Sequence, residues 1–244
     1  MLTLETVLKY TTVNESKKDK ISVIVVCGGS SQRMKGIDKM LAEINGIPVC
    51  VRSILAFQNC NSVTDIVVVT KEENVLKLQQ LCGQFKLTKV TDIVVGGSCR
   101  QQSVYNGLIQ LSDDTDVVLI HDGARPFVTA ECIERVINGA KENSAVTCAV
   151  SPKDTIKVKM EDGLVVSTPD RNTLSAVQTP QGFKYSLYLS AVEQSIDKLD
   201  GFTDDCSIVE SVGYPVYIVE GDYKNIKITT AEDLEIAEIF AKEL

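Results

Sequence analysis

Short apolar runs alternate along this chain with segments whose apolar residues recur at helical spacing. The apolar runs predict strands at Ile21–Cys27, Asp65–Thr70, Lys89–Val95, Asp116–His121 and Ala145–Val150. The helical spacing predicts helices between them, at Pro48–Gln58, Asn74–Cys82, Arg100–Leu111 and Ala130–Glu142. Strands and helices that alternate in this way build a mainly parallel sheet with helices on both faces. The pattern therefore predicts an α/β fold.

The alternation breaks after Val150. Two segments, Thr155–Met160 and Leu164–Thr168, flank an Asp-Gly pair, which is favoured in tight hairpin turns. We predict a β-hairpin that projects from the sheet as an arm over about 152–176. Its several apolar residues are too many for a solvated ribbon, because an isolated hairpin is only marginally stable in water. We expect a second copy of the chain to cover them in an isologous dimer.

Beyond the arm, the pattern predicts shorter elements. A helix is expected at Lys184–Lys198, and another after the capping sequence that begins at Thr203. Val216–Glu220 and Asn225–Ile228 are expected to be short strands. Thr230 is expected to cap the last helix. The buried side of that helix would comprise Leu234, Ile236, Ala237 and Phe240.

Composition narrows the class of protein. The 244 residues suit one large domain over 21–244, preceded by a flexible extension over 1–20. The net charge of −8, with basic residues gathered only near Lys17–Lys20, argues against binding to nucleic acid or to an anionic membrane. No apolar run is long enough to span a bilayer, and the first residues lack the order of a signal peptide. We expect a cytoplasmic protein.

The eight cysteines do not suggest a zinc site. No two of them form a C-x-x-C pair, and the chain has a single histidine. Most of these cysteines lie within apolar or helical patterns. We interpret them as buried thiols in a reducing compartment.

The first strand ends in a loop that could hold a phosphate. Small residues follow Cys27 in the sequence Gly-Gly-Ser-Ser, and two cations, Arg33 and Lys39, come next. Backbone N–H groups in such a loop approach a phosphate closely. The loop matches neither the Walker pattern nor the dinucleotide pattern. Its alternative interpretation is a glycine turn after a core strand, with solvated charges.

Four further segments bring polar groups to the ends of elements, although each could instead be structural. They are Gly96–Ser103, His121–Pro126, Thr155 with Asp170-Arg171, and Asn225–Ile228. We favour a structural role for His121, because it alternates away from Asp122 on the strand. The cations Arg33, Lys39, Arg125, Arg171 and Lys227 have no nucleophile triad beside them. Cations without a nucleophile suit phosphoryl or nucleotidyl transfer, in which positioning and electrostatics supply most of the catalysis.

Eight motifs in order carry a more specific resemblance. They are CGGSSQRM…DK, GGSCRQQSV, HDGARPF, KDTIK, DR, AVQTPQGF, TDD and VEGDYKNIKITTAEDL. Together they resemble the 2-C-methyl-D-erythritol 4-phosphate cytidylyltransferase family of the non-mevalonate isoprenoid pathway, over about residues 21–240. The resemblance implies a Rossmann-like nucleotidyltransferase fold with a protruding β-arm. It also implies a homodimer in which the arm embraces the partner.

The resemblance further implies a role for individual residues. The nucleotide would be bound by Cys27, Gly28, Gly29, Gly97, Ser98, Ser103, Asp122 and Gly123. The catalytic residues would be Arg33, Lys39, Arg171 and Lys227. The sugar phosphate would also contact Arg125, Thr155 and Thr203. Two departures from the family pattern, the sequence from Cys27 to Ser31 and a shorter spacing from Arg33 to Lys39, leave the path of the first loop open.

The implied reaction transfers CMP from CTP to 2-C-methyl-D-erythritol 4-phosphate and releases pyrophosphate. Mg²⁺, or another divalent cation, would be held mainly by the CTP phosphates, so no protein ligand for a metal is identified. One alternative is a ribitol-5-phosphate cytidylyltransferase, which shares the core motifs. A second alternative is a catalytically silent nucleotide-binding regulator on the same fold.

Overall fold

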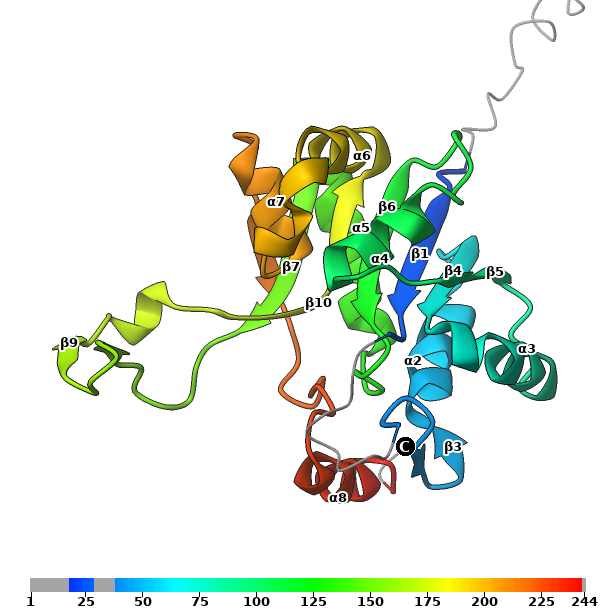
Figure 1. The fold of residues 1–244 in the computed structure, drawn as a ribbon, viewed down its shortest axis with the longest axis horizontal. Coiled ribbons are helices and arrows are strands. Elements are labelled where there is room, and N and C mark those ends of the chain that lie inside the picture. Colours follow the sequence, from blue (N-terminus) through cyan, green and yellow to red (C-terminus); the bar gives the residue numbers. More distant parts are fainter. Residues whose placement is uncertain (1–17, 29–37, 243–244) are drawn as a thin grey trace, which may run out of the picture.

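The computed structural model describes residues 18–28 and 38–242. Its centre is a sheet of seven strands in the order β11-β7-β10-β6-β1-β4-β5 (Figure 1). The strands are β1 (Ile21–Val26), β4 (Asp65–Thr70), β5 (Val90–Val95), β6 (Val117–Asp122), β7 (Ala145–Val150), β10 (Ala176–Lys184) and β11 (Tyr217–Glu220). All neighbouring pairs are parallel except the two that β10 makes with β6 and β7.

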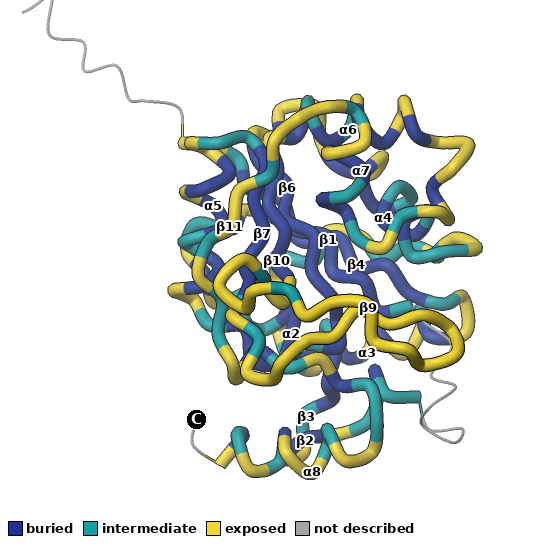
Figure 2. Tube along the Cα trace, turned by 90° about the vertical axis from the view of Figure 1, so that its left-hand side faces the viewer, coloured by how far each residue is buried: buried dark blue, intermediate teal, exposed yellow. Residues whose placement is uncertain are grey.

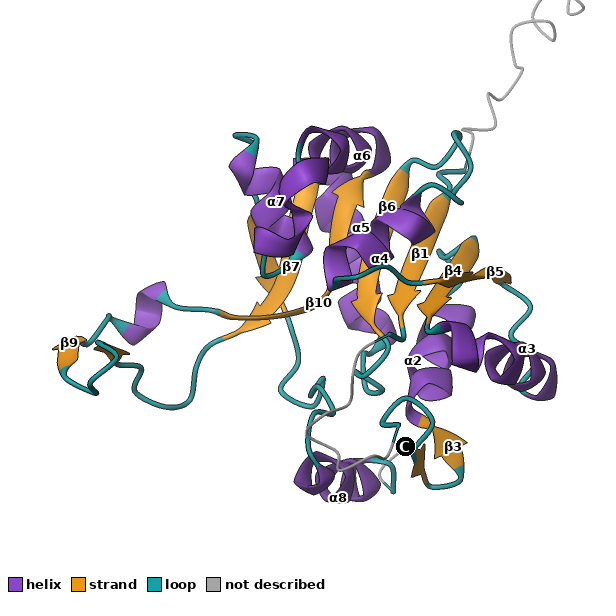
Figure 3. Ribbon diagram, viewed as in Figure 1, coloured by secondary structure: helices purple, strands orange, loops and turns teal. Residues whose placement is uncertain are grey.

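Helices cover both faces of the sheet (Figure 3). One face packs against α2 (Val49–Gln58), α3 (Val75–Gln84) and α5 (Ala130–Asn143). The other face packs against α4 (Arg100–Leu108), α6 (Tyr185–Gln194) and α7 (Asp205–Ser211). Successive residues of β1 alternate between these two cores, Val23 and Val25 toward the first and Ile24 and Val26 toward the second. The central strands are therefore buried along their length, as Figure 2 shows in dark blue.

The α/β prediction is confirmed. The bounds of each of the five strands predicted before residue 151 differ by at most one residue from those of an observed strand. The four helices between them are also present. No helix among the described residues is long and apolar enough to cross a membrane. All eight cysteines are free thiols, and six of them are buried.

Two predictions for the last third of the chain are wrong. Asn225–Ile228 forms no strand; it is a loop whose amide at Ile228 donates to the carbonyl of Ala124 at 2.8 Å. The predicted helix to Lys198 ends at Gln194 and continues as 3-10 turns, η4 (Ile196–Gly201). In the last helix, α8 (Ala231–Phe240), the cap at Thr230 is confirmed. Its buried side is narrower than predicted, because Ile236 is exposed.

The strand β10 was not predicted, because its sequence Gln-Thr-Pro-Gln-Gly lacks the expected apolar alternation. Its polar side chains are buried and join the sheet to its surroundings. Gln178 binds the backbone of Asp222 in both directions, at 2.8 and 3.2 Å. Gln181 accepts from the amide of Asp205 and donates to Asp204, at 3.0 and 2.7 Å. Hydrogen bonds therefore join β10 to two segments, one at Asp222 and one at Asp204 and Asp205.

The arm leaves the sheet between β7 and β10 and carries a short hairpin of β8 (Val158–Lys159) and β9 (Val165–Ser167). Figure 1 shows it extending away from the domain on the side opposite to α3. Its apolar residues are exposed, among them Met160, Leu164 and Val166 at 55, 61 and 56%. The predicted projection is confirmed. The short η3 turn (Arg171–Thr173) lies on the return segment.

Smaller elements complete the domain. A two-stranded hairpin of β2 (Glu43–Ile44) and β3 (Ile47–Pro48) shares a satellite core with α8, and η2 (Glu72–Asn74) leads into α3. Most of the predicted extension lies outside the described residues. Of the remainder, the Lys20 ammonium contacts Asp114 at 2.8 Å and Asp19 pairs with Lys141 at 2.8 Å. The chain is thus attached to the domain just before β1.

Candidate active site

The candidate site lies at the topological switch point of the sheet, where successive strands begin to be added on the other side of β1. The chain runs outward from β1 through β4 to β5, then returns along α4 to β6 on the other side of β1. Ligands of open α/β sheets bind at such a point, beyond the carboxyl ends of the strands. Gly28 follows β1 there, and Asp122 ends β6. Only glycine fits at position 123, because a Cβ atom there would lie 2.5 Å from the Cys27 sulfur.

Asp122 gathers three cations around its carboxylate. The Arg100 Nε lies 3.2 Å from Oδ1, while the Lys227 Nζ and the Arg125 Nε lie 2.8 and 3.7 Å from Oδ2. Arg100 also binds Asp205 through Nη1 at 2.7 Å. These cations come from α4, from the turn after β6 and from the loop before α8. The fold thus brings distant segments to one carboxylate.

The charges of this cluster stabilise one another. Burial alone would raise the pKa of Asp122, but Arg100, Lys227 and Arg125 outweigh it and hold that pKa well below its usual range. Burial also opposes the charge of Arg100, yet Asp205 and Asp122 raise its pKa. Asp122 and Arg100 are therefore both charged at neutral pH. An anion that enters meets positive groups that are already in place, which is the condition for electrostatic catalysis.

A cavity of about 330 Å³ opens beside the cluster. Its lining includes Arg100 and Lys227 from the cluster, together with Thr203 and Asp204 from the loop before α7. The Lys227 side chain is 39% exposed, so its ammonium is accessible while it pairs with Asp122. Arg125, Thr203 and Lys227, which the resemblance assigned to the sugar phosphate and to catalysis, therefore share one cavity.

The predicted base-binding turn is present between β5 and α4. The Ser103 hydroxyl accepts from the amide of Gly97 at 3.0 Å and donates to the carbonyl of Cys99 at 2.9 Å. A side chain at 97 would collide with Gln102, so this glycine permits the turn. Gly97 and Ser98 are exposed. The structure thus leaves these two residues open to a ligand, whereas Ser103 holds the turn.

Other predicted residues are not brought to this cavity. Gly29 and Arg33 lie outside the described residues. Lys39 follows Asp38, whose carboxylate accepts from Asn74 at 2.7 Å. Thr155 and Arg171 lie together on the exposed arm, with Arg171 Nη2 3.4 Å from the Thr155 hydroxyl. Figure 1 shows the arm pointing away from the domain, so one chain does not place these two residues at the Asp122 cluster.

Sequence reasoning missed Arg100, the cation that joins Asp122 to the buried Asp205. It lies in the GGSCRQQSV motif at the start of α4, but we considered only the glycines and serines there. Gln181 was also missed, because its role depends on β10. The signal for Arg100 is an arginine that directly follows a turn at the carboxyl edge of the sheet, as Arg125 does.

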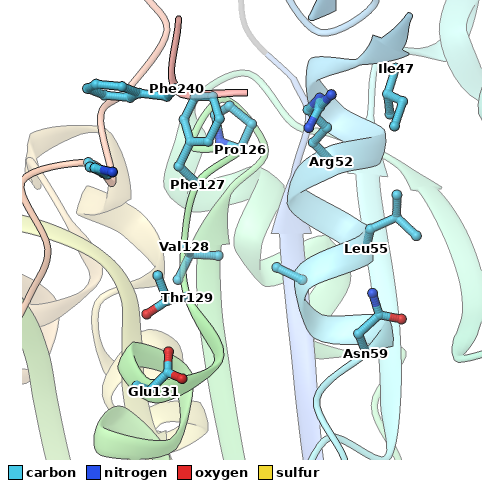
Figure 4. A pocket seen from close by; sticks show the side chains of 12 residues that line it. Ile47, Arg52, Leu55, Asn59, Pro126, Phe127, Val128, Thr129, Glu131 and Phe240 are labelled. Atoms are coloured by element: carbon cyan, nitrogen blue, oxygen red, sulfur yellow. The ribbon is translucent and has the colours of Figure 1, made fainter. Parts of the chain in front are cut away.

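A second, larger cavity of about 490 Å³ lies apart from these charges (Figure 4). Its walls are mostly apolar and come from α2, from Pro126–Thr129 and from Phe240 of α8. Figure 4 shows Leu55 and Phe127 on opposite sides of it. Its lining includes none of the predicted site residues. The charged cavity beside Asp122 is therefore the better candidate for a phosphate substrate.

Comparisons with known proteins agree with the fold and the motifs. A family model described as "IspD: 2-C-methyl-D-erythritol 4-phosphate cytidylyltransferase" matches residues 21–243. The chain belongs to this family. It is a cytidylyltransferase, and its reaction is CTP-dependent cytidylyl transfer to 2-C-methyl-D-erythritol 4-phosphate in isoprenoid biosynthesis.

Individual relatives of this IspD-family chain are similar over nearly their whole length. The enzyme of that name from Clostridium botulinum (strain ATCC 19397 / Type A) is 43% identical over 92% of this chain and 99% of its own length. The one from Caldanaerobacter subterraneus is 44% identical over 91 and 99%. A crystal structure of 4-diphosphocytidyl-2C-methyl-D-erythritol synthase from Anaerococcus prevotii superposes with a TM-score of 0.83 at 29% identity, covering 92% of this chain and 97% of that one.

Proposed function

We propose that the cytidylyl transfer takes place in the cavity beside Asp122, by a single in-line displacement. A phosphate oxygen of the acceptor attacks the α-phosphorus of CTP, and the bond from that phosphorus to the pyrophosphate oxygen breaks. The observation that carries this proposal is the convergence of Arg100, Arg125 and Lys227 on one open cavity. No covalent intermediate is required, because positioned cations supply what this reaction needs.

The cations divide the work by their exposure. Lys227, the most accessible of the three, contacts the phosphate of the acceptor and orients the attacking oxygen. Arg125, whose side chain is only 12% exposed, contacts the sugar phosphate from the floor of the cavity. Arg100 is held by two carboxylates and fixes Asp122, so it acts as a positioning residue. Arg33 and Lys39 neutralise the charge that develops as pyrophosphate leaves, as the family resemblance implies.

The nucleotide extends from this cavity toward β1 and β5. Cys27, Gly28 and Gly29 follow β1, where the triphosphate would lie against backbone N–H groups. Gly97 and Ser98 present an exposed turn to the cytosine. Ser103 supports that turn through its bond from the Gly97 amide. Asp122 and Gly123 complete the nucleoside subsite at the end of β6.

Magnesium enters this proposal as part of the substrate. The described residues contain no group of three or more metal-ligating side chains. The Asp122 carboxylate does not fit a divalent ion either, because cations already surround both of its oxygens. We assign no step to a protein-bound metal. The CTP phosphates are the hard oxygen ligands that Mg²⁺ prefers.

The arm is proposed to complete the site of a second copy. Thr155 and Arg171 are exposed on it, apart from the cluster of their own chain, and its apolar residues are uncovered. An isologous dimer would bury these residues and bring Arg171 to the partner's acceptor phosphate. The eight thiols without a disulfide suit the cytoplasm, which is the compartment we propose.

A turnover assay tests the proposed function. Pyrophosphate release should require CTP, Mg²⁺ and 2-C-methyl-D-erythritol 4-phosphate together. Faster turnover with ribitol 5-phosphate would transfer the assignment to the rival acceptor, and nucleotide binding without turnover would support the silent regulator. The matched variants are Lys227→Met, which should reduce kcat by roughly 10²–10³-fold, and Lys184→Met. Lys184 is exposed at the far end of β10, so its variant should keep normal turnover.

A further inference from the structure

Four residues beside the Asp122 cluster form a closed ring of hydrogen bonds. His121 Nε2 lies 3.2 Å from the carbonyl oxygen of Arg125, and its Nδ1 lies 3.1 Å from the Thr179 hydroxyl. Asn225 Nδ2 donates to the carbonyl of Thr179 at 2.8 Å. Arg125 Nη1 donates to the carbonyl of Asn225 at 2.8 Å, which closes the ring. We call these residues the His121 ring.

Three of the four ring residues are buried, and the ring joins three separate segments. His121 and Asn225 are fully buried, and Thr179 is 5% exposed. His121 is the penultimate residue of β6, Thr179 lies in β10, and Asn225 belongs to the loop before α8. Because water does not compete for these bonds, their geometry is fixed by the fold.

The donors and acceptors of the ring determine the tautomer of His121. The Arg125 carbonyl can only accept, so Nε2 carries a proton. The Thr179 hydroxyl accepts from the amide of Asp122 at 3.1 Å, and its own hydrogen is then available to Nδ1. A neutral imidazole with its proton on Nε2 satisfies all of these bonds. The Phe57 ring packs edge-on against it at 4.8 Å, a contact that also suits a neutral ring.

The ring also fixes the backbone around Lys227. Asn225, two residues before it, binds both Thr179 and Arg125. Ile228, directly after it, donates to the carbonyl of Ala124. Lys227 is therefore held on both sides by contacts to the β6 turn, and its ammonium reaches Asp122.

We propose that His121 is a positioning residue: as the neutral Nε2–H tautomer, it closes a hydrogen-bonded ring that sets Arg125 and Lys227 against Asp122. It does not transfer protons in the reaction, because it is enclosed by Thr179, Arg125 and Phe57. This inference rests on the proposed site, since it explains how two of the cations there are oriented. A small misplacement of such groups can cost about 10²-fold in rate.

The first experiment is a ¹⁵N NMR spectrum of the full-length protein labelled at histidine. The chain has one histidine, so the spectrum contains one imidazole and requires no assignment. We expect a neutral ring at pH 7 with the proton on Nε2. A proton on Nδ1, or a charged ring at pH 7, would overturn the proposal. This result does not depend on which acceptor the enzyme uses.

The second experiment separates positioning from general stability. Thr179→Val keeps the shape but removes the hydroxyl between Asp122 and His121. We expect kcat to fall about 10- to 100-fold, the KM for CTP to change little, and the Arg125 side-chain N–H signals to exchange faster with water. Thr179→Ser restores the hydroxyl and should restore kcat. The control is Thr115→Val, a buried threonine before β6 whose hydroxyl binds Ser22 at 3.2 Å, far from the site.

The outcomes distinguish a positioning role of the His121 ring from a purely stabilising one. Wild-type kcat in Thr179→Val, or an equal loss of kcat in Thr115→Val, would show that the ring only stabilises the fold. If Thr179→Val does not fold, His121→Leu takes its place, because leucine can neither donate to the Arg125 carbonyl nor accept from Thr179. Unchanged Arg125 signals and unchanged kcat in that variant would contradict the proposal. An inactive wild type with the expected tautomer would refute the proposed function alone.

Discussion

The Asp122 cluster and the arm carry residues of the same predicted site, yet the fold treats them in opposite ways. Arg100 and Arg125 are each held by a further contact, to Asp205 and to the Asn225 carbonyl, and the Asp122 carboxylate is only 10% exposed. On the arm, Arg171 has one long hydrogen bond to Thr155, and both are solvated. The first region is built within one chain, whereas the second has few contacts within that chain, and we propose that a second copy supplies the rest. Preorganisation therefore stops at the boundary of the domain.

The most severe test of the contrast between the Asp122 cluster and the arm is to remove the negative charge of Asp122. In Asp122→Asn, three cations lose their shared counter-charge. We expect kcat to fall by at least about 10³-fold and the free energy of unfolding by about 3 kcal/mol. Steady-state kinetics and urea unfolding measure the two losses. Asp116→Asn, a surface carboxylate that accepts from the Lys20 amide, is the control and should change kcat little. A stable, active Asp122→Asn would mean that the cations do not need their anchor.

Removing the tip of the arm should abolish activity without affecting the domain. We replace residues 157–168 by a short Gly-Ser linker. Because this hairpin lies outside all the core clusters, we expect the urea midpoint to remain near that of the wild type. Turnover should fall by at least about 10²-fold, and sedimentation should show a monomer.

A point variant sharpens the same test. Leu164→Asp places a charge on the arm at a residue that is 61% exposed, and it should weaken the dimer. Leu76→Asp places the same charge on α3 at a residue that is 73% exposed, and it should leave the dimer intact. A fully active monomer, from either the arm replacement or Leu164→Asp, would show that Arg171 acts within its own chain or not at all.

Mixing two inactive variants tests whether the regions meet between chains. A heterodimer of Arg171→Ala and Lys227→Ala would contain one site with both residues intact. With random assortment, about a quarter of the wild-type activity should return. Each variant alone is the control. No recovery in a mixture that sedimentation shows to be exchanged would place both residues in the same chain's site.

The smallest expected effect is the pH dependence of stability, which should come from the domain and not from the arm. Burial lowers the pKa of His121 from 6.5 to about 4, with Asp122 opposing and Arg125 and Arg100 adding smaller effects. Below pH 6.5 the unfolded chain therefore binds a proton that the folded chain refuses until about pH 4. Stability should fall by up to about 3 kcal/mol over this range.

Chemical unfolding at several pH values measures this dependence. His121→Gln should show a flatter profile than the wild type between pH 6.5 and 4. The arm-replaced protein, which keeps His121, should follow the wild type. A dependence that is unchanged in His121→Gln would assign it to carboxylates.

The sequence predictions are accurate where the local sequence determines an element and fail where contacts with distant segments determine it. The β-α alternation as far as Val150 could be predicted, because each element there is encoded by its own apolar period. The strand β10 could not, because Gln178, Thr179 and Gln181 are buried where they hydrogen-bond to segments distant in the sequence. Asn225–Ile228 has the composition of a strand, but the Ile228 amide donates to Ala124 in the β6 turn, and the amides of Asn225 and Ile226 make local turn bonds.

The site residues likewise include some that sequence motifs identify and others that only the tertiary structure reveals. Arg125 and Lys227 could be identified from their motifs, and the structure places both beside Asp122. Arg100 was overlooked, because only the tertiary structure shows that Asp205 is buried behind it. The role of Arg171 stays a prediction, because the structure shows it only beside Thr155 on the exposed arm.

The position of the arm has a consequence for how the protein can change. The strands β7 and β10 are antiparallel neighbours, and their ladder pairs Val150 with Ala176 at the base of the arm. The whole segment between them is thus the loop of one large hairpin that is already closed by the sheet. Lengthening such a loop costs little, since the entropy of closure grows only with the logarithm of its length. Insertions or exchanged tips can therefore alter the surface offered to a partner while the register of the sheet stays as it is.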